Sequence, residues 1–434
     1  MNSRLLAILA VVALLMTAVA CSSSAPSPAA TSVAKLAAPT AAPANSAAPA
    51  GPTSQASPAG QAATAAPTAA RAAAPAAAPT AAPAAARPAG SSVPRMKSPE
   101  AGVQVFMWGV PDIGRDLKLA KDAGFTWVKQ MFQWNYIERD GKGKFLWDEP
   151  DRLVKAANNY GLKIVARVDY SPDWAKATKG YNSPPERMSD FGDFIYALVS
   201  RYKTGSPHGT IAAYEIWNEP NLSREWGDQP PNAAQYVEML KAAYTAAKKA
   251  DPNAVIITAG LSPTGTVSPE ARPDDVYLEE MYKAGAKDYF DVLGVHAAGY
   301  KAPPEMSPDE IAANKDYGGQ RFFGFRRVED LRKIMVQNGD EKKQVAVMEM
   351  GWTTDNRPGS PYAWHAVTEQ QKGEYIVRAY QYAQKNWAPW IGLMSTIYIS
   401  APQWTDKDEQ YYWALTDPNG TPRASYNYIK GKLP

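Results

Sequence analysis

Cysteine and histidine are scarce in this chain. Its 434 residues include one cysteine and three histidines, and the histidines are far apart in the sequence: His208, His296 and His365. A single cysteine cannot form an internal disulfide, and no group of cysteines and histidines has the spacing of a zinc site. We therefore expect no disulfide within the chain, and neither a metal ion nor a cofactor.

Long apolar runs are lacking beyond the first twenty residues. Residues 5–20 form an apolar run behind Arg4, which is short for a membrane span but has the layout of a secretory signal. A short N-terminal membrane anchor is the alternative reading. We expect a signal peptide over residues 1–20 and no later stretch that is apolar enough to cross a bilayer.

The single cysteine, Cys21, directly follows this apolar run. That position indicates a lipidated N-terminal cysteine, as in bacterial lipoproteins. Such signals usually carry leucine three residues before the cysteine, where this chain has Ala18, and Ala18-Val19-Ala20 also fits an ordinary cleavage site. We expect an extracellular or cell-envelope protein, anchored to the outer face of the membrane through a lipid on Cys21.

Acidic residues are absent before Glu100, and large apolar side chains are rare in residues 22–98, which are mostly Ala, Pro, Ser and Thr. Such a segment cannot bury enough apolar surface to offset the entropy of ordering, and its prolines interrupt any long helix. We expect residues 21–98 to form a disordered tether before a folded domain over residues 99–434.

The positive charge of the chain is concentrated in this first part. Six basic residues precede Glu100, so the formal net charge of +3 becomes about −3 over the remainder. A mildly acidic folded domain gives no indication of a nucleic-acid surface.

From Gly102 onward, short apolar runs alternate with amphipathic ones. The apolar runs predict strands over residues 103–108, 125–131, 162–168, 211–217, 255–259, 289–296, 344–350 and 391–399. The amphipathic runs predict helices over residues 113–123, 149–160, 188–202, 233–250, 275–284, 325–337, 368–385 and 426–430. Eight strand–helix units favour a closed (β/α)8 TIM barrel. An open doubly wound sheet would carry a glycine-rich loop after the first strand, and Trp108-Gly109-Val110-Pro111 is not one.

Two glutamates stand at the carboxyl ends of predicted strands, where such barrels carry their functional groups. Glu349 lies inside an apolar strand, where an unpaired carboxylate is costly, and Glu219 ends the fourth strand before Pro220. Taken alone, Glu349 has the ordinary interpretation of a structural glutamate in a salt bridge, and Glu219 that of a glutamate in a surface turn. Together, paired carboxylates are the minimal equipment for glycoside hydrolysis, in which one is expected to stay protonated and the other ionised.

The two segments around these residues, YEIWNEPN at 214–221 and VAVMEMGW at 345–352, resemble glycoside hydrolase clan A, which holds families such as 5 and 39. The resemblance implies a retaining β-glycosidase with Glu219 as the acid/base, Asn218 beside it and Glu349 as the nucleophile. The second segment departs from the clan, because Met348 and Met350 stand where Thr and Phe are common.

Neighbours of the two acids are candidates for support. The Asn218 amide is placed to bind the sugar 2-hydroxyl. The alternative is that its side chain only caps the turn after the strand. Glu215 shares a strand face with Glu219 and should lie deeper in the barrel. We predict that Arg167, in an apolar strand, pairs with Glu215 or with Glu349, either to keep the nucleophile ionised or as an architectural ion pair.

Further substrate-binding candidates come from strand ends and from aromatic residues. His296 ends the sixth strand and Tyr300 follows it, and the resemblance implies that such residues contact substrate or nucleophile; a core histidine is the alternative. Tryptophans follow many strands, and their faces suit stacking on sugars, although each one alone is as readily a packing residue. These are Trp108, Trp134, Trp174, Trp226, Trp352 and Trp404, of which Trp352 and Trp404 are the predicted substrate contacts.

The sequence therefore predicts a secreted retaining β-glycosidase that acts on a carbohydrate. A carbohydrate-binding envelope lipoprotein on a barrel scaffold is the second hypothesis, which the presence of both glutamates disfavours. The third is a barrel enzyme with different chemistry, such as a lyase or an aldolase. A Schiff-base aldolase would need a lysine near a strand end, for which Lys129 is the candidate, since Lys163 begins its strand.

Overall fold

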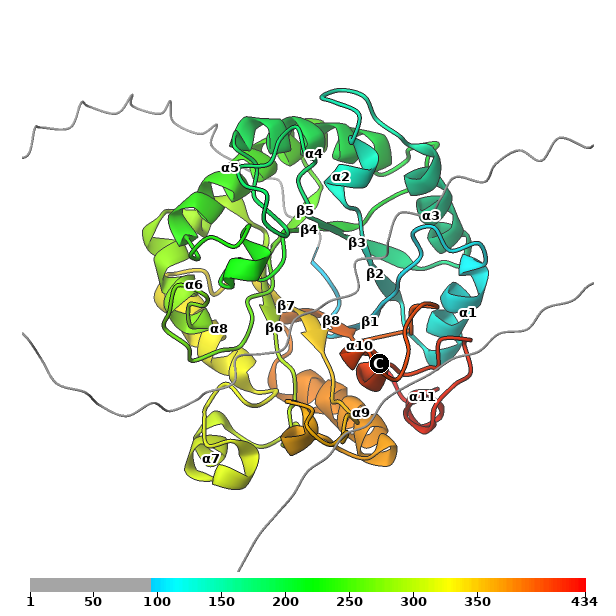
Figure 1. The fold of residues 1–434 in the computed structure, drawn as a ribbon, viewed down its shortest axis with the longest axis vertical. Coiled ribbons are helices and arrows are strands. Elements are labelled where there is room, and N and C mark those ends of the chain that lie inside the picture. The colour runs from blue at the N-terminus through cyan, green and yellow to red at the C-terminus, as the bar shows by residue number, and fades with distance from the viewer. Residues whose placement is uncertain (1–94) are drawn as a thin grey trace, which may run out of the picture. The chain divides into compact units, whose positions relative to one another are not determined.

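A computed structural model describes residues 95–434 of the protein, and its eight parallel strands close into a barrel in chain order (Figure 1). The strands are β1 (Glu100–Gln104), β2 (Trp127–Met131), β3 (Lys163–Val168), β4 (Ala213–Ile216), β5 (Val255–Thr258), β6 (Val292–His296), β7 (Gln344–Met350) and β8 (Ile391–Thr396). The predicted (β/α)8 fold is confirmed. The expected signal over residues 1–20, Cys21 and the expected tether as far as residue 94 lie outside the described residues.

Helices follow the strands and surround the barrel (Figure 1). The longer ones are α1 (Ile113–Ala123), α3 (Asp148–Asn159), α4 (Met188–Tyr202), α5 (Ala233–Ala250), α6 (Asp274–Lys283), α8 (Arg327–Gln337) and α9 (Glu369–Asn386), and the last is α11 (Ala424–Ile429). Local signals set their ends. The Asp112 side chain accepts from the Arg115 N–H at the start of α1, and Gly124 ends that helix in the left-handed conformation with a φ of 103°.

Apolar side chains fill the inside of the barrel as well as the layer between strands and helices. The inner set is Met96, Trp127, Val165, Ala213, Val255, Ile257, Val292, Ala346, Met348 and Leu393. Because both faces of the sheet are covered, every residue of β3 except Lys163 is buried. A filled interior leaves the rim at the carboxyl ends of the strands for functional side chains.

The predicted bounds of α1, α4, α5 and β7 agree with the structure, and most others differ by a few residues. The largest shift is in the first strand, predicted over residues 103–108 and observed at Glu100–Gln104. Val105 still donates to the Lys129 carbonyl at 3.0 Å, but the chain then leaves the barrel. Three short helices were not predicted: α2 (Trp134–Ile137), α7 (Pro308–Ala313) and α10 (Glu409–Trp413). Each lies in a loop after a strand.

Left-handed backbone is concentrated at the same rim. Within residues 95–434, the non-glycine residues with positive φ are Tyr170, Asn182, Trp217, Glu219, Asp228 and Tyr300. All six follow the carboxyl ends of β3, β4 or β6. Such conformations cost about 1–3 kcal/mol each and persist only where the surroundings enforce them, which occurs most often at functional sites.

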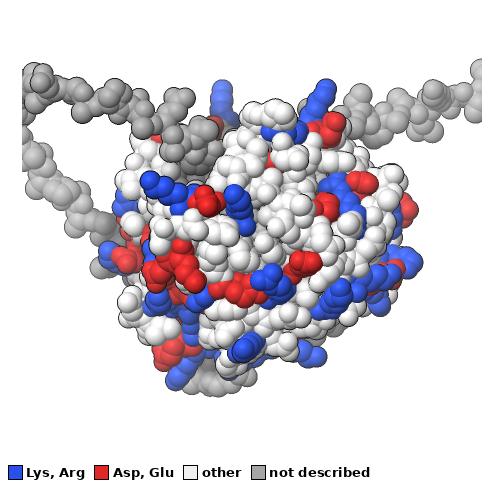
Figure 2. All heavy atoms as spheres, turned by 90° about the horizontal axis from the view of Figure 1, so that it is seen from below, with Lys and Arg blue, Asp and Glu red and all other residues white. Residues whose placement is uncertain are grey.

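The face of the domain seen in Figure 2 carries basic and acidic side chains close to one another, with no large area of one sign. Many charged side chains of the domain are paired: Arg378 Nη2, for example, lies 2.6 Å from Glu305 Oε2. Among residues 95–434, no helix has the length and apolar character needed to span a membrane.

Candidate active site

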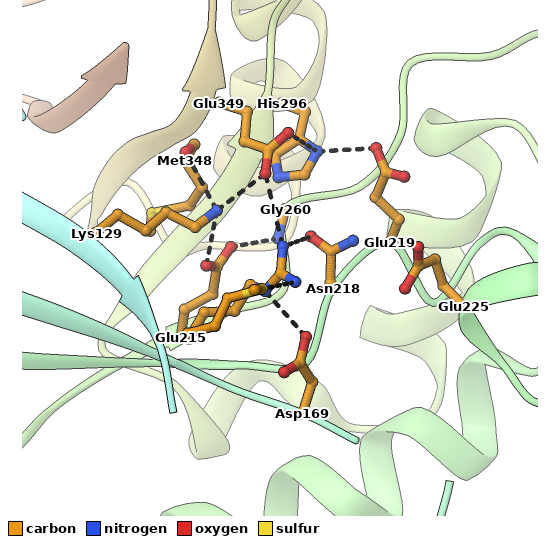
Figure 3. A network of polar contacts seen from close by, with 12 residues as sticks. Lys129, Asp169, Glu215, Asn218, Glu219, Glu225, Gly260, His296, Met348 and Glu349 are labelled. Atoms are coloured by element: carbon orange, nitrogen blue, oxygen red, sulfur yellow. Dashed lines mark hydrogen bonds and ion pairs between the residues drawn. The ribbon is translucent and has the colours of Figure 1, made fainter. Parts of the chain in front are cut away.

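Glu219 is held by an unusual stretch of backbone after β4. Trp217 and Glu219 have φ of 75° and 39°, in the region that L-residues rarely adopt. The Glu219 N–H donates to the Gly260 carbonyl at 3.1 Å, and Trp217 Nε1 donates to the Glu225 carbonyl at 2.7 Å. These bonds fix the turn, which directs the Glu219 carboxylate toward His296 (Figure 3).

Glu349 and His296 lie side by side on β7 and β6, where they are register partners. His296 Nδ1 lies 3.0 Å from Glu219 Oε1 and 4.0 Å from Glu349 Oε2 (Figure 3). The two glutamates that the sequence singles out therefore converge on one imidazole at one rim of the barrel, and His296 lies between them.

Gly260, two residues after β5, leaves room for this arrangement. A Cβ at this position would overlap Cδ2 and Nε2 of His296. The Gly260 N–H donates to Glu215 Oε1 at 3.3 Å, while its carbonyl accepts from Glu219. One residue without a side chain thus contacts the acid, the imidazole and the buried Glu215.

Two cations lie beside Glu349 on its inner side. Lys129 Nζ is 3.3 Å from Glu349 Oε1 and 3.0 Å from Glu215 Oε2, and both Lys129 and Glu215 are almost fully buried. Arg167 Nη1 lies 3.8 Å from the same Glu349 oxygen. Of the two predicted arginine pairings, the one with Glu349 forms, whereas Glu215 pairs with Lys129. Because two carboxylates engage its ammonium, Lys129 is poorly suited to form a Schiff base.

The charges around Glu349 favour its ionised form. Burial acts to raise the pKa of Glu349, and so does the charge of Glu219. His296, Lys129 and Arg167 together outweigh both, and the pKa lies below its ordinary value. An ionised carboxylate is the form that attacks carbon.

Glu219 contradicts the expectation of a carboxyl group held protonated. Burial acts to raise its pKa, but the hydrogen bond with His296 and the charge of Arg224 outweigh burial and lower the pKa to about 2. Arg224 Nη2 lies 3.0 Å from Glu219 Oε2. The expectation was wrong because it counted the repulsion from Glu349 and neither of these two partners.

Arg167 also orients Asn218. Its Nη1 donates to Asn218 Oδ1 at 3.3 Å, which turns the amide Nδ2 away from the arginine (Figure 3). Arg167 Nε lies 2.9 Å from Asp169 Oδ2, and burial raises the pKa of Asp169 to about 7. The Arg167 guanidinium is therefore held between Asp169, Asn218 and Glu349.

An aromatic group lies on the loops after β6 and β7. Tyr300 stacks on Trp364 with ring centroids 6.2 Å apart, and Phe323 packs edge-on against Tyr300 at 4.7 Å. Trp364 is 42% exposed, so part of this side chain remains accessible. Burial raises the pKa of Tyr300, with a contribution from the charge of Glu219, so this group lies near the acid.

A second aromatic group lies after β1 and β8. Trp404 packs edge-on against Phe106 and Tyr398, with centroids 4.7 and 5.3 Å away. Burial raises the pKa of Tyr398, and the charge of Glu349 adds to this, so the tyrosine lies near Glu349. Trp404 is only 8% exposed and supports Tyr398 more than it faces solvent.

Trp352, a predicted substrate contact, requires correction. It is fully buried, and its Nε1 donates to the Ala302 carbonyl at 3.0 Å, so it packs beneath the loop after β6 and offers no face to a sugar. Trp134 and Trp226 are buried in the same way, whereas Trp108 and Trp174 are half-buried. The sequence correctly placed these tryptophans after strands. It could not show that the Trp352 side chain points into the core instead of toward the rim of the barrel.

The other two histidines have partners other than Glu219 and Glu349. His208 Nδ1 is 3.1 Å from Asp151 Oδ2, and His365 packs against Trp364 and Tyr300 with its pKa lowered to about 4 by burial. Within residues 95–434, no group of three or more His, Cys, Asp and Glu side chains is arranged to hold a metal ion.

Several site residues were missed from the sequence. Lys129 was considered only as a Schiff-base lysine. A charged lysine inside an apolar strand needs a partner just as Glu349 does, and this was a usable signal. Asp169 lies two residues after Arg167 and hence on the same strand face, a usable signal. Arg224 and Gly260 lie in the connections after β4 and β5. The sequence does not show that the first contacts Glu219 or that the second contacts Glu219 and Glu215.

Part of the chain is similar to a known protein family. The chain matches the family model of cellulase (glycosyl hydrolase family 5) over residues 89–301, a range that includes Glu219 and His296 but ends before Glu349. β-Xylosidase from Geobacillus stearothermophilus is 32% identical over 77 residues, which is 17% of this chain and 15% of that protein. Endo-1,4-β-xylanase C from Paenibacillus barcinonensis is 24% identical over 242 residues, 50% of this chain and 21% of that protein. The chain thus spans about a fifth or less of these curated relatives.

The fold is similar to that of a solved family 39 glycoside hydrolase from the gut symbiont Bacteroides cellulosilyticus WH2. The TM-score is 0.56 at 19% sequence identity, and the match covers 76% of this chain and 62% of that one. At this identity the likeness shows the fold. The family model agrees with the resemblance carried by the first sequence motif, and the likeness in fold agrees with the predicted barrel.

Proposed function

We propose that the chain hydrolyses O-glycosidic bonds in β-linked oligo- or polysaccharides with retention at the anomeric carbon, supported by the match of residues 89–301 to the cellulase family model and by the likeness of the barrel to that of a family 39 glycoside hydrolase. Glu349 is the nucleophile and Glu219 the acid/base. One observation carries this proposal: a single nitrogen of His296 lies 3.0 Å from one carboxylate and 4.0 Å from the other.

The separation of the two acids is compatible with retention. Retaining enzymes hold their carboxyl groups about 5–5.5 Å apart, and inverting enzymes about 6.5–9.5 Å, to leave room for a water molecule. Glu219 Oε1 and Glu349 Oε2 lie 3.0 and 4.0 Å from the same imidazole nitrogen, so these two oxygens cannot be farther apart than the two distances added together. This limit includes the whole retaining range and only the lower end of the inverting range, and the choice of retention rests on the resemblance to clan A.

In the first step, a Glu349 oxygen attacks the anomeric carbon, and the bond from that carbon to the leaving oxygen breaks. Protonated Glu219 gives its proton to the leaving oxygen, which departs as an alcohol. Lys129, Arg167 and His296 stabilise Glu349 as the attacking carboxylate. Asn218, oriented by Arg167, is placed to bind the sugar 2-hydroxyl.

In the second step, Glu219 is ionised and takes a proton from a water molecule as that water attacks the anomeric carbon. The bond from the carbon to Glu349 breaks, and the nucleophile leaves as a carboxylate. Two successive inversions restore the configuration of the substrate. His296 contacts both carboxylates and keeps their relative position through the two steps.

The test is a panel of aryl β-xylosides and β-glucosides with xylan and cellulose, polymers chosen from the names of the relatives and of the family model. Product is followed by proton nuclear magnetic resonance, and the β-anomer is expected to appear before mutarotation. First appearance of the α-anomer would mean inversion and contradict the mechanism. Binding of oligosaccharides without turnover of any substrate would instead support the carbohydrate-binding hypothesis.

We also propose that the chain is exported and held at the cell envelope by a lipid on Cys21, on the strength of the apolar run that precedes this cysteine. Expressed from a bacterial host with lipoprotein processing, the full chain should fractionate with membranes, and the Cys21→Ser variant should appear in the soluble export fraction. Equal distribution of the two proteins would exclude the lipid anchor.

A further inference from the structure

Within residues 95–434, Arg224 is the one arginine that forms an ion pair with Glu219, the proposed acid/base. It lies in the short 3-10 helix η1 (Ser223–Glu225), five residues after Glu219. Its Nη2 is 3.0 Å from Glu219 Oε2, while Glu219 Oε1 faces His296 Nδ1 at 3.0 Å. Both oxygens of the carboxyl group are therefore engaged in the structure without substrate.

This arrangement suits one half of the reaction. A guanidinium is always charged and only donates hydrogen bonds, so it favours a carboxylate over a neutral carboxyl group. The second step needs Glu219 as a carboxylate, and the first step needs it protonated. An arginine at 3.0 Å therefore prepares Glu219 for the second step and opposes the first.

Arg224 has a second carboxylate within reach. Its Nε lies 3.9 Å from Glu225 Oε1, and Glu225 is buried and accepts from Asn182 Nδ2 at 2.8 Å. Figure 3 shows the carboxylates of Glu219 and Glu225 near one another. The charge of Arg224 also acts on Glu409 of α10, where it opposes the rise in pKa that burial causes. A small movement of the guanidinium can therefore exchange one carboxylate for another without leaving it unpaired.

Resting on the function proposed above, we propose that Arg224 is a positioning residue that controls when Glu219 carries a proton. It holds Glu219 as a carboxylate in the free enzyme and in the second step. When a sugar occupies the leaving-group side, Arg224 moves toward Glu225, and Glu219 takes up the proton that it delivers to the leaving oxygen.

Other charged and titratable groups also face Glu219 and stay in place in this scheme. They are Glu225 from η1, His296 from β6, Tyr300 after β6, Glu349 from β7 and Tyr398 after β8. Of the two partners that lower its pKa, His296 also contacts the nucleophile, so Arg224 is the one whose removal changes Glu219 selectively.

The test compares the pH dependence of kcat/KM for the wild type and Arg224→Met, using a phenyl glycoside and a 2,4-dinitrophenyl glycoside. Loss of the cation should raise the pKa of Glu219, so the alkaline limb for the phenyl glycoside should move up by about one pH unit or more. Above the wild-type limb, hydrolysis should be about tenfold faster. The dinitrophenyl substrate needs little proton donation, and its kcat/KM should change much less.

Two further variants make the result decisive. Arg224→Lys keeps a cation and should keep the wild-type limb, and Arg378→Met, which breaks an ion pair with Glu305 on the outside of the barrel, should change nothing. An unmoved limb in a folded Arg224→Met protein, judged by its melting temperature, would overturn the inference. If Arg224→Met does not fold, a wild-type limb in Arg224→Gln would overturn it as well.

The failure of this inference can be told apart from failure of the proposed function. Glu219→Ala should slow the phenyl glycoside far more than the dinitrophenyl glycoside. If it slows neither, Glu219 is not the acid and the proposed function fails. If it behaves as expected while Arg224→Met leaves the pH profile unchanged, only the role of Arg224 is wrong.

Discussion

Replacing Glu349 by glycine is expected to lower kcat for a phenyl β-glycoside by on the order of 10⁵-fold, because the substitution removes the proposed nucleophile. Three neighbouring groups, Lys129, Arg167 and His296, cannot replace the lost carboxylate. The two cations have no free electron pair with which to attack carbon, and Nδ1 of the imidazole is engaged by Glu219. The measurement is the initial rate of phenol release with the purified full-length chain.

Added azide or formate should restore part of this activity. A small anion fits the volume left by the carboxylate and is drawn there by Lys129 and Arg167. With azide, the product should be a glycosyl azide of the α-configuration, because a single displacement inverts the anomeric carbon. Glu341→Gly, in the exposed turn before β7, serves as the matched control and should retain wild-type activity. Near-normal turnover of every glycoside by Glu349→Gly would contradict the assignment.

Replacing Lys129 by methionine is expected to reduce both stability and activity. Glu215 would be left as a buried carboxylate without its cation, and breaking one side of a buried pair typically costs about 3–5 kcal/mol. Glu349 would lose one of the charges that lower its pKa, so the acidic limb of kcat/KM should move to higher pH. Urea denaturation and a pH profile measure the two effects separately.

The double variant Lys129→Met/Glu215→Gln distinguishes the two roles of the lysine. Removing both charges avoids the unpaired carboxylate, so most of the stability should return, while the shifted acidic limb should remain because Glu349 still lacks Lys129. Lys118→Met, which breaks an exposed ion pair on α1, is the control and should change stability by less than about 1 kcal/mol. Wild-type stability of Lys129→Met would show that the buried pair is not formed.

The barrel could be predicted from the sequence because each unit carries its own local evidence. Strands such as β7 are apolar on both faces, and α1, α4 and α5 have apolar stripes long enough to fix their bounds. The helices α2, α7 and α10 have six residues or fewer, too short for a stripe to be recognised. Whether such a short segment becomes helical depends on tertiary contacts with neighbouring loops, which the local sequence does not show.

The carboxylates could be predicted and their partners could not. Glu219 and Glu349 stand in recognisable motifs at strand ends. Arg167 and Glu215 are register partners on β3 and β4, yet each pairs mainly with another residue. Which cation meets which acid depends on how side chains cross the interior of a closed barrel. A tryptophan after a strand likewise turns toward the rim or into the core according to loops that its spacing does not reveal.

Glycine at position 260 has a consequence for how this protein could change over time or by design. Any side chain there would displace the imidazole that contacts both carboxylates, so the proposed proton transfer and the proposed bond formation would be disturbed together. Independent adjustment has to come from the cations, since Arg224 contacts only Glu219 of the two, and Lys129 and Arg167 contact only Glu349. Variation in pH optimum or in the slow step among related barrels should therefore be sought at those three positions, with residue 260 left unaltered.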